Sequence, residues 1–232
     1  MERESFMCAI ADIIFENQIV AREIRNKNES IVFGNENLTL KNLNQVFPHY
    51  RFSTLHQQHT NEIVEALERD IEPLADGQFS RESFVGLVIK TADCLPIFLS
   101  DGTTVVALHA GWKGVENGIV KRAKSYFANS TATYYIGPHI QASHFEFSLE
   151  RAKELIENVG YPRSEIEKIL TPFSDTKGLL NLTALAEFQL QSWARKGYVC
   201  EINTLTDPVY HSHRRNNQNK KRNLSFIVRT HN

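Results

Sequence analysis

Short apolar runs rich in β-branched residues recur through the middle and the later part of the chain. Six of them have the length and composition of strands, namely residues 84–90, 95–99, 104–108, 134–136, 198–205 and 224–228. Ser100, Asp101 and Gly102 separate the second run from the third, and this triplet is typical of a tight turn. The sequence therefore predicts a β-hairpin between residues 95 and 108.

A second pattern, with apolar side chains every three or four positions, predicts amphipathic helices. It occurs in residues 115–127, 149–159 and 182–196. Ser148 is the expected N-cap of the second helix, and Gly160 and Gly197 are expected to end the second and third helices. Strands and helices do not alternate strictly, which favours an α+β fold over a doubly wound parallel sheet. No repeat or Pro-rich linker interrupts the chain, so we expect a single domain over residues 1–232.

Polar side chains with metal-binding chemistry stand beside these runs. Cys94 directly precedes the first hairpin strand and His109 directly follows the second, so hairpin pairing places both at one end of the sheet. His59 lies in a polar segment before another apolar stretch. A thiolate and two imidazoles can hold Zn²⁺ and leave its fourth position open for water or substrate. The spacing alone also allows a buried cysteine and two core histidines.

The neighbours of these three residues add to the candidate site. Asp93 is a candidate base, or a carboxylate that orients a ligand imidazole, and its alternative role is that of a turn residue. Gly111 and Gly114 would let backbone N–H groups approach a ligand closely, although a tight strand-to-helix turn needs glycines equally. Trp112 between them is either a stacking surface or part of the packing.

Several basic residues are candidates for binding an anion. Lys113 is one, and Arg214 and Arg215 are two more in the polar segment 211–223, which we expect to form a loop before the last strand. The alternative is a solvated surface loop without a partner. His139 lies in a Gly-Pro loop and is a candidate substrate contact, with a solvated loop histidine as the alternative. Three further histidines are possible members of the site: His56, His211 and His213.

Composition and charge argue against several classes of protein. The chain has 232 residues with 26 basic and 27 acidic side chains, and its formal charge of −1 gives no global attraction to nucleic acid or an acidic membrane. No apolar run is long enough to span a bilayer, and the acidic start is unlike a signal peptide, so we expect a cytoplasmic protein. Cys8, Cys94 and Cys200 are too scattered for a disulfide framework. The sequence leaves monomer or dimer open.

Two motifs, TADCLPI (91–97) and HAGWKG (109–114), resemble the hallmark motifs of the laccase-domain proteins. This family is also called multicopper polyphenol oxidase-like, or the purine nucleoside phosphorylase family. Five shorter segments resemble family motifs: QQHT (57–60), ADG (75–77), IGPHI (136–140), HFEF (144–147) and HSHRR (211–215). The similarity runs from about residue 50 to the end, and the earlier residues match poorly. Lys113 stands where arginine is commoner, and Asn181 where aspartate is usual.

The resemblance implies a four-layer α/β/β/α sandwich with mixed sheets. It also implies that His59, Cys94 and His109 hold the metal, with zinc expected and copper less favoured. Members of the family are credited with phosphorolysis of adenosine, inosine and methylthioadenosine, and with adenosine deamination, while older descriptions call them polyphenol oxidases. The partners expected for this chain are therefore a purine nucleoside and phosphate, without nucleic acid or membrane.

The chemistry of the candidate site suits these activities to different degrees. Zn²⁺ lowers the pKa of bound water to about 7, which suits deamination of adenine, but the His-x-Glu and Pro-Cys-x-x-Cys signature of zinc deaminases is absent. Phosphorolysis needs phosphate held beside C1′, for which Lys113, Arg214 and Arg215 are candidates. A copper oxidase is less favoured, because the chain has only two methionines for an axial ligand and a single His-x-His pair.

Two other function classes remain open from the sequence. The fold implied by the resemblance is grouped with Cys-His hydrolases, in which Cys94 would be the nucleophile and His109 its base. The metal-ligand and nucleophile roles use the same residues, so the sequence does not separate them. A module that binds RNA through residues 211–223 is the least favoured alternative, because the chain lacks a global positive charge and an aromatic-rich RNA motif.

Overall fold

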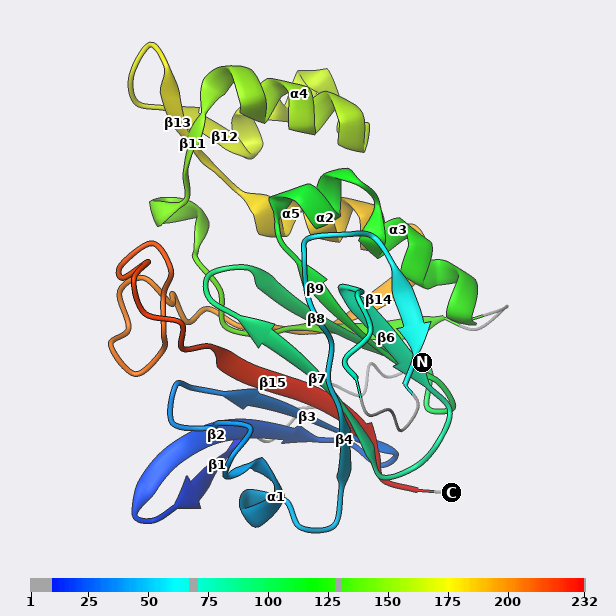
Figure 1. Ribbon diagram of the computed structural model, residues 1–232. Coiled ribbons are helices and arrows are strands. Elements are labelled where there is room, and N and C mark those ends of the chain that lie inside the picture. The colour runs from blue at the N-terminus through cyan, green and yellow to red at the C-terminus, as the bar shows by residue number, and fades with distance from the viewer. Residues whose placement is uncertain (1–9, 67–70, 128–130, 232) are drawn as a thin grey trace, which may run out of the picture.

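Two six-stranded mixed sheets lie face to face and form the centre of the molecule (Figure 1). The computed structural model describes residues 10–66, 71–127 and 131–231. Helices cover the outer face of the second sheet, and one short helix, α1 (Leu43–Val46), lies outside the first sheet. The expected α+β class and the layer order α/β/β/α are therefore confirmed, although the outer layer on the first sheet is a single helical turn. Among the described residues, no helix has the length and apolar character needed to cross a membrane.

The first sheet combines strands from early and late parts of the chain. Its order is β1 (Ile10–Phe15), β2 (Gln18–Arg25), β3 (Glu29–Gly34), β15 (Asn223–Arg229), β7 (Val85–Thr91) and β4 (Arg51–Ser53). All neighbours are antiparallel except β4 and β7. Strand β15 lies between β3 and β7, so it connects the three early strands to the rest of the sheet.

The second sheet contains the predicted hairpin at its centre. Its order is β14 (Ala194–Val199), β10 (Ala132–Ile136), β8 (Leu95–Ser100), β9 (Val105–Ala110), β6 (Gly77–Ser80) and β5 (Ile63–Glu65). The hairpin strands β8 and β9 are antiparallel, with Ser100 opposite Val105 beside the turn, which confirms the prediction. The outermost strand on each side is parallel to its neighbour.

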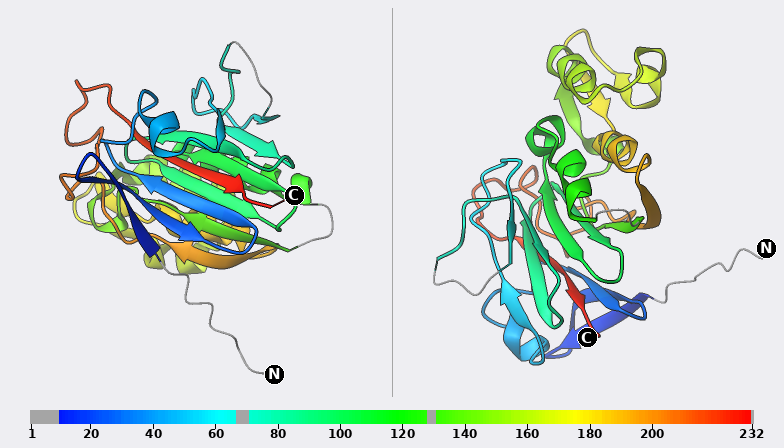
Figure 2. Two further views of the ribbon diagram at one scale, coloured as in Figure 1. Left: turned by 90° about the horizontal axis from the view of Figure 1, so that it is seen from below. Right: turned by 90° about the vertical axis from the view of Figure 1, so that its right-hand side faces the viewer.

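A helical layer packs on the second sheet, as both views in Figure 2 also show. It contains α2 (Trp112–Glu116), α3 (Ile119–Ala123) and α5 (Leu182–Leu190), and α4 (Leu149–Val159) packs on the far side of this layer against α2 and α5. Beside α4 stands a small antiparallel sheet of β11 (Glu146–Ser148), β13 (Lys177–Leu180) and β12 (Leu170–Pro172). Three 3₁₀ turns complete this part of the chain: Lys124–Phe127, Ala142–His144 and Arg163–Lys168.

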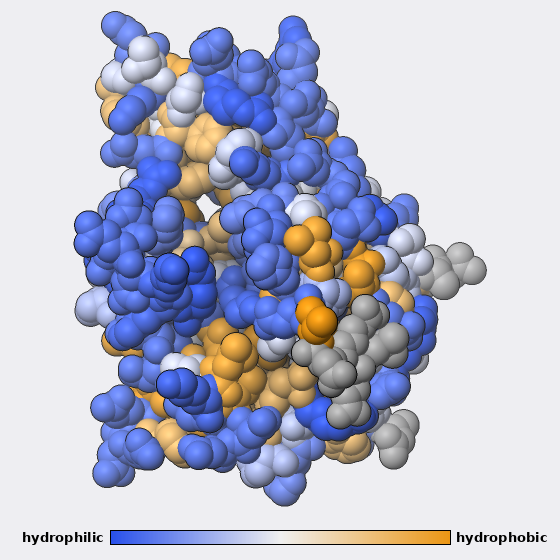
Figure 3. Space-filling view, in the orientation of Figure 1, coloured by the Kyte–Doolittle hydropathy of each residue, from blue (hydrophilic) through white to orange (hydrophobic). Residues whose placement is uncertain are grey.

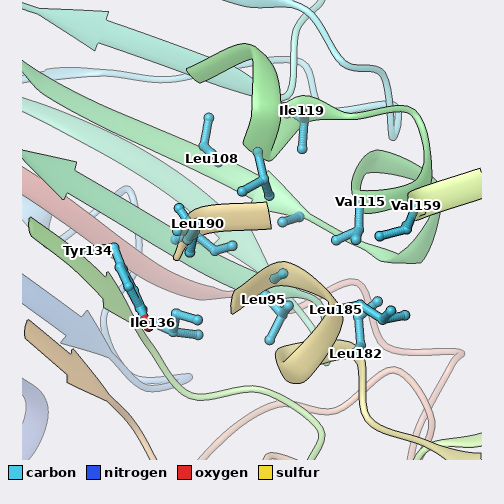
Figure 4. Packing of buried hydrophobic residues seen from close by; sticks show 14 of the residues in the cluster. Leu95, Leu108, Val115, Ile119, Tyr134, Ile136, Val159, Leu182, Leu185 and Leu190 are labelled. Atoms are coloured by element: carbon cyan, nitrogen blue, oxygen red, sulfur yellow. The ribbon is translucent and has the colours of Figure 1, made fainter. Parts of the chain in front are cut away.

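The largest apolar cluster joins the second sheet to the helices. Leu95 and Leu108 on the hairpin face Val115 of α2 and Leu185 of α5 (Figure 4). A second cluster fills the space between the two sheets, and a third covers the outer face of the first sheet beside α1. The hairpin strands are buried along their whole length, because they are covered on both faces. This rigid hairpin carries Cys94 and His109 at one end.

One predicted helix agrees with the structure at both ends. Helix α4 spans Leu149–Val159, the side chain of Ser148 accepts a hydrogen bond from the N–H of Arg151, and Gly160 adopts a φ of 79° after the last turn. Both caps therefore follow from the sequence pattern.

Two other predicted helices are shorter than expected. The segment 115–127 divides into α2, α3 and a 3₁₀ turn, because Gly118 adopts a left-handed φ of 80°. Helix α5 ends at Leu190, and the chain enters β14 at Ala194, so the predicted strand 198–205 is wrong over most of its length. Gly197 does not stop a helix. It is the extra residue where the register of β14 against β10 shifts.

Candidate metal centre and its cavity

The structure brings His59, Cys94 and His109 together at the end of the hairpin. Cys94 precedes β8 and His109 lies near the end of β9, where Pro96 is its partner across the hairpin. His59 reaches the same point from the loop before β5. One possible ligand atom from each residue lies within 4.8 Å of the other two. The shared position that hairpin pairing predicted for Cys94 and His109 is confirmed.

The distances within this group fit a metal ion. The Sγ atom of Cys94 lies 3.8 Å from Nε2 of His59. Tetrahedral coordination of Zn²⁺ with ordinary bond lengths would separate a sulfur and a nitrogen ligand by about 3.6 Å. His109 is buried, Cys94 is half-buried and His59 is exposed, so the group is closed on one side and open on the other. An open side is typical of a metal that keeps one position for water or substrate.

A buried carboxylate, Asp76, positions two of the three residues. Its Oδ1 accepts a hydrogen bond from Nδ1 of His109 at 2.7 Å, which leaves Nε2 of that ring for the metal. Its Oδ2 accepts from the backbone N–H of Thr60 at 2.6 Å and from that of Gln58 at 3.1 Å, the two neighbours of His59. Asp76 begins the turn into β6 and has no exposed surface. It therefore fixes the ring of His109 and the loop that carries His59.

The electrostatics of the group favour an ionised thiol at Cys94 and a protonated imidazole at His109. Burial opposes a charge on Cys94, but the charge of His109 and hydrogen bonds from both imidazoles prevail and lower the pKa of the thiol to about 6. Burial also opposes a charge on His109, but the Cys94 thiolate and Asp76 raise its pKa to about 9. Burial alone would raise the pKa of Asp76, yet its hydrogen bonds from His109, Thr60 and Gln58 lower it. The metal-free chain thus holds a thiolate–imidazolium pair, and a metal would replace the proton of His109.

The backbone is strained at two positions of the site. His59 has a φ of 61° and Asp93 has a φ of 83°, in the left-handed region that non-glycine residues rarely adopt. Strain of this kind concentrates at functional sites, where the surrounding contacts hold it. Gly111 serves a close approach, because a Cβ atom there would lie 2.8 Å from Cδ2 of His59 and 3.0 Å from Sγ of Cys94. The side chains of His59 and Cys94 therefore fill the space that a side chain at position 111 would need.

Asp93 has partners that differ from the expected ones. Its carboxylate accepts a hydrogen bond from Oγ1 of Thr204 and one from the backbone N–H of Arg214, both at 2.7 Å. Its carbonyl oxygen accepts from the N–H of Ile140 at 3.0 Å. The carboxylate that orients a ligand imidazole is therefore Asp76 and not Asp93. Asp93 instead ties two loops to the end of the hairpin, and its role as a base stays a prediction.

A cavity of about 740 Å³ opens from the candidate metal-binding group. Ligand sites in proteins usually measure about 300–1,000 Å³. Asp93 is the one carboxylate among its lining residues, and Trp112, Phe145 and Phe147 form an aromatic wall. Figure 3 shows a gap on the left of the face drawn there, bordered by both apolar and hydrophilic residues. The five cationic residues that line the cavity are Lys90, Lys113, Arg214, Lys220 and Arg222.

Two of the three predicted anion ligands reach this cavity. The Nζ of Lys113 lies 5.5 Å from the ring centre of Trp112, and the Cζ of Arg214 lies 5.4 Å from that of Phe145. Arg215 does not line the cavity. Its guanidinium donates hydrogen bonds to the carbonyl oxygens of Thr204, Leu205, Asp207 and Tyr210. The expectation that Arg215 holds an anion is corrected, because its donors are used to fold the preceding loop.

His139 is likewise a structural residue. It is 1% exposed, its Nδ1 pairs with the carbonyl oxygen of Gly137 at 2.8 Å, and its Nε2 lies 2.8 Å from Oγ1 of Thr183. Burial lowers its pKa to about 4, so the ring is neutral. The structure therefore overturns both expectations for His139, the substrate contact and the solvated loop histidine.

The remaining candidates divide between the cavity and the interior. Trp112, His56 and His213 line the cavity, whereas His211 is buried and is not among the lining residues. Cys200 is buried and free. Cys8, Met1 and Met7 lie outside the described residues. Within the ranges that the structure describes, His59, Cys94 and His109 are the one group of three or more ligating side chains that could hold a metal.

Comparison with known proteins connects this site to a family. The model of the family described as multi-copper polyphenol oxidoreductase laccase matches residues 23–230, which extends the similarity well before residue 50. A protein named purine nucleoside phosphorylase from Clostridium acetobutylicum is 31% identical over 216 residues, covering 88% of this chain and 87% of that protein. Another protein of that name, from Rickettsia conorii, is 33% identical over 139 residues, or 56% of this chain and 57% of its own length.

Solved structures show the same fold. A protein of Neisseria meningitidis aligns with a TM-score of 0.79 at 21% identity, over 96% of this chain and 99% of its own. The YlmD protein of Geobacillus stearothermophilus aligns with a TM-score of 0.77 at 19% identity, over 95% of this chain and 100% of its own. The matched segment includes every residue of the candidate metal centre, and the chain belongs to the multi-copper polyphenol oxidoreductase laccase family.

Proposed function

We propose that this protein is a zinc-dependent purine nucleoside phosphorylase that acts on adenosine, inosine and methylthioadenosine. The observation that carries the proposal is the position of the His59–Cys94–His109 group in a cavity with an aromatic wall and several cations. Relatives that bear the name purine nucleoside phosphorylase support the same reaction class. Flat aromatic surfaces suit a purine base, and cations suit phosphate. We further propose that the enzyme is a single cytoplasmic domain.

The donor set favours zinc over copper. One thiolate and two imidazoles with an open fourth position are typical of catalytic zinc, whereas a blue-copper site often adds an axial methionine. Zn²⁺ in such a site polarises an oxygen atom or lowers the pKa of a bound water to about 7. Once a metal displaces one proton from His109, Asp76 would keep the remaining proton on Nδ1, and Nε2 would be the atom that holds the metal. The Cys94 thiolate supplies the negative ligand.

Phosphorolysis assigns roles to the residues around the metal. A phosphate oxygen attacks C1′ of the nucleoside, the bond to the purine nitrogen breaks, and the purine leaves with a proton. Lys113 and Arg214 hold the phosphate, because both line the cavity and neither forms an ion pair with a carboxylate of the described chain. Asp93 is the one carboxylate of the lining and is the group that would exchange a proton with the substrate.

The test is release of the base from adenosine and inosine by protein of known metal content, with and without phosphate. Release of adenine and hypoxanthine that depends on phosphate is the expected result. Formation of inosine from adenosine, without release of a base, would replace the phosphorylase by a zinc deaminase that uses the same centre. No reaction with either nucleoside would overturn the proposal.

A Cys-His hydrolase is the second candidate, and one observation favours it. The thiol of Cys94 is ionised near neutral pH beside His109, as in enzymes with a cysteine nucleophile. Metal content and alkylation separate the two functions. A hydrolase would be active after complete metal removal and would lose activity on alkylation of Cys94. The phosphorylase is expected to lose activity when the metal is removed.

A further inference from the structure

The cavity carries more positive charge than one phosphate requires. Of its five cations, Lys90 forms an ion pair with Glu72 at 2.9 Å. The other four, Lys113, Arg214, Lys220 and Arg222, have no carboxylate within ion-pair distance among the described residues. The one carboxylate of the lining, Asp93, already accepts two hydrogen bonds. A purine nucleoside is uncharged, and a phosphate monoester has a charge of about −1.5 to −2 at neutral pH, which is more negative than inorganic phosphate.

The loop 212–222 presents two of these cations in an ordered way. Its neck is closed by Asn223, which accepts a hydrogen bond from the N–H of His211 and donates one to its carbonyl oxygen, both at 2.8 Å. Asn223 is 1% exposed, so the closure is a built feature of the fold. Figure 1 shows the loop beside the end of the sheets, and three of its residues, Arg214, Lys220 and Arg222, line the cavity.

Alternate residues of the loop face opposite ways. Lys220 and Arg222 line the cavity, whereas Lys221 between them forms an ion pair with Glu36 at 3.2 Å, away from the cavity. Arg222 is held by a hydrogen bond from Nη1 to the carbonyl oxygen of Lys221 at 2.7 Å. Its charge lies near the buried ring of His211, where burial and this charge both lower the pKa of the imidazole. The loop thus directs two cations into the cavity and one out of it.

We infer that Lys220 and Arg222 form a second anion subsite, which holds a phosphate ester carried by the substrate itself. Lys113 and Arg214 balance the inorganic phosphate of the proposed reaction, and the second pair balances a phosphorylated ribose. A purine nucleoside monophosphate is then expected to bind more tightly than a neutral nucleoside. This inference rests on the proposed function for the nature of the base and sugar, and on the loop geometry for the added charge.

The test compares adenosine 5′-monophosphate with adenosine. Binding of each to the full-length, metal-loaded protein is measured calorimetrically in phosphate-free buffer at physiological salt. The monophosphate is expected to bind about tenfold more tightly, since charge-assisted hydrogen bonds to two cations are added. In the double variant K220A/R222A the ratio of the two affinities is expected to fall to near one. The conservative variant K220R/R222K is expected to keep the preference.

Lys221 provides the matched control. The variant K221A removes one positive charge from the same loop without touching the cavity, so its affinity ratio should equal that of the wild type. Equal binding of both compounds to the wild type would overturn the inference, as would an unchanged ratio in K220A/R222A. A similar loss in K221A would also overturn it, because the effect would then be one of general charge.

Release of adenine from adenosine separates this inference from the proposed function. Turnover of adenosine without a preference for the monophosphate would remove the second subsite and leave the phosphorylase. Tighter binding of the monophosphate without phosphate-dependent release of adenine would remove the phosphorylase and support the subsite.

Discussion

At the scale of single residues, Asp76 has the widest influence on the candidate metal centre. One buried carboxylate accepts hydrogen bonds from the ring of His109 and from both neighbours of His59. Partners of this kind orient metal ligands and raise their basicity. Cys94 is held differently, since it immediately precedes a strand whose backbone is paired on both sides. Asp76 therefore positions His59 and His109, whereas the paired strand β8 positions Cys94.

The substitution Asp76→Asn tests this dependence. Loss of the carboxylate charge weakens the hydrogen bond to Nδ1 of His109, and zinc affinity is expected to fall by about 10- to 100-fold. Competition with a chromophoric chelator measures the zinc affinity. Asp12→Asn is the control, because Asp12 makes a half-exposed ion pair with Arg22, remote in the first sheet. Unchanged affinity in the Asp76 variant, with its fold intact by circular dichroism, would contradict the assignment.

The lowered pKa of Cys94 has a direct chemical signature. The folded protein stabilises the thiolate, so in metal-free protein the alkylation rate should be half-maximal near the pKa of about 6, fall below that pH and level off above it. An ordinary cysteine would continue to gain reactivity up to about pH 8.5. Burial raises the pKa of Cys200, so that thiol should stay unreactive. A rate that still rises steeply at pH 8 would refute the thiolate–imidazolium pair.

Part of the candidate site was predictable from residues close together in the sequence, and part depends on contacts between distant residues. Cys94 and His109 were predicted to meet because hairpin pairing is local. Asp76 lies in the ADG segment (75–77), but its contact with His109 was not predictable, because this contact crosses 33 positions and depends on the pairing of β6 with β9. Arg215 and His139 have the residue types expected of ligands, but burial and carbonyl partners decide their roles, and neither is visible in a sequence.

At the scale of elements, the turn from β9 into α2 packs closely against the candidate metal centre. Gly111 has a φ of −69° and a ψ of 169°, which any residue can adopt, so glycine is needed there for space rather than for backbone freedom. The side chains that occupy this space belong to His59 and Cys94. The turn and the metal ligands therefore pack against each other directly.

Gly111→Ala isolates this packing. The added methyl group must displace His59 or Cys94 by several tenths of an ångström, and metal distances tolerate only about 0.2 Å, so zinc affinity is expected to fall by about tenfold or more. Gly114→Ala is the matched control, because its added Cβ would make ordinary contacts at 3.4 Å. Chelator competition measures both variants. Equal affinity in the two would show that the ligands move freely.

Element prediction succeeded where local signals decide the structure. The hairpin has a turn triplet between two apolar runs, and α4 has a cap at each end. The prediction was wrong where a glycine is compatible with two local structures. Gly118 lies in a segment with a helical pattern but adopts a left-handed φ, which divides the helix. Gly197 was expected to end a helix but is the extra residue where the register of β14 against β10 shifts. No strand was predicted for residues 10–34, where β1, β2 and β3 form half of the first sheet by pairing with each other and with β15.

At the scale of the whole molecule, metal binding and folding should be linked. The three ligands come from two separate segments, the loop before β5 and the hairpin, which only the folded chain brings together. A ligand that binds only the folded state at 100 times its dissociation constant stabilises it by about 2.7 kcal/mol. For a chain of this size that corresponds to a rise in Tm of about 5–10 °C.

Thermal unfolding with and without a chelator measures this linkage. The wild type is expected to lose about 5–10 °C in Tm when the metal is removed. Cys94→Ala should show no dependence on the metal, and Cys200→Ala should respond like the wild type because Cys200 is buried apart from the centre. An equal loss in the Cys94 variant would place the stabilising metal elsewhere.

The position of β15 has a consequence for the order of events during synthesis. This strand joins β3 to β7, and the loop before it carries Arg214, Lys220 and Arg222. Until residues 223–229 leave the ribosome, β3 and β7 each expose an open edge, and open edges are sites of mispairing between chains. The hairpin with Cys94 and His109 has emerged long before. All three candidate metal ligands therefore leave the ribosome before the loop that carries three of the cavity's five cations, and that loop reaches its place only when the last strand closes the first sheet.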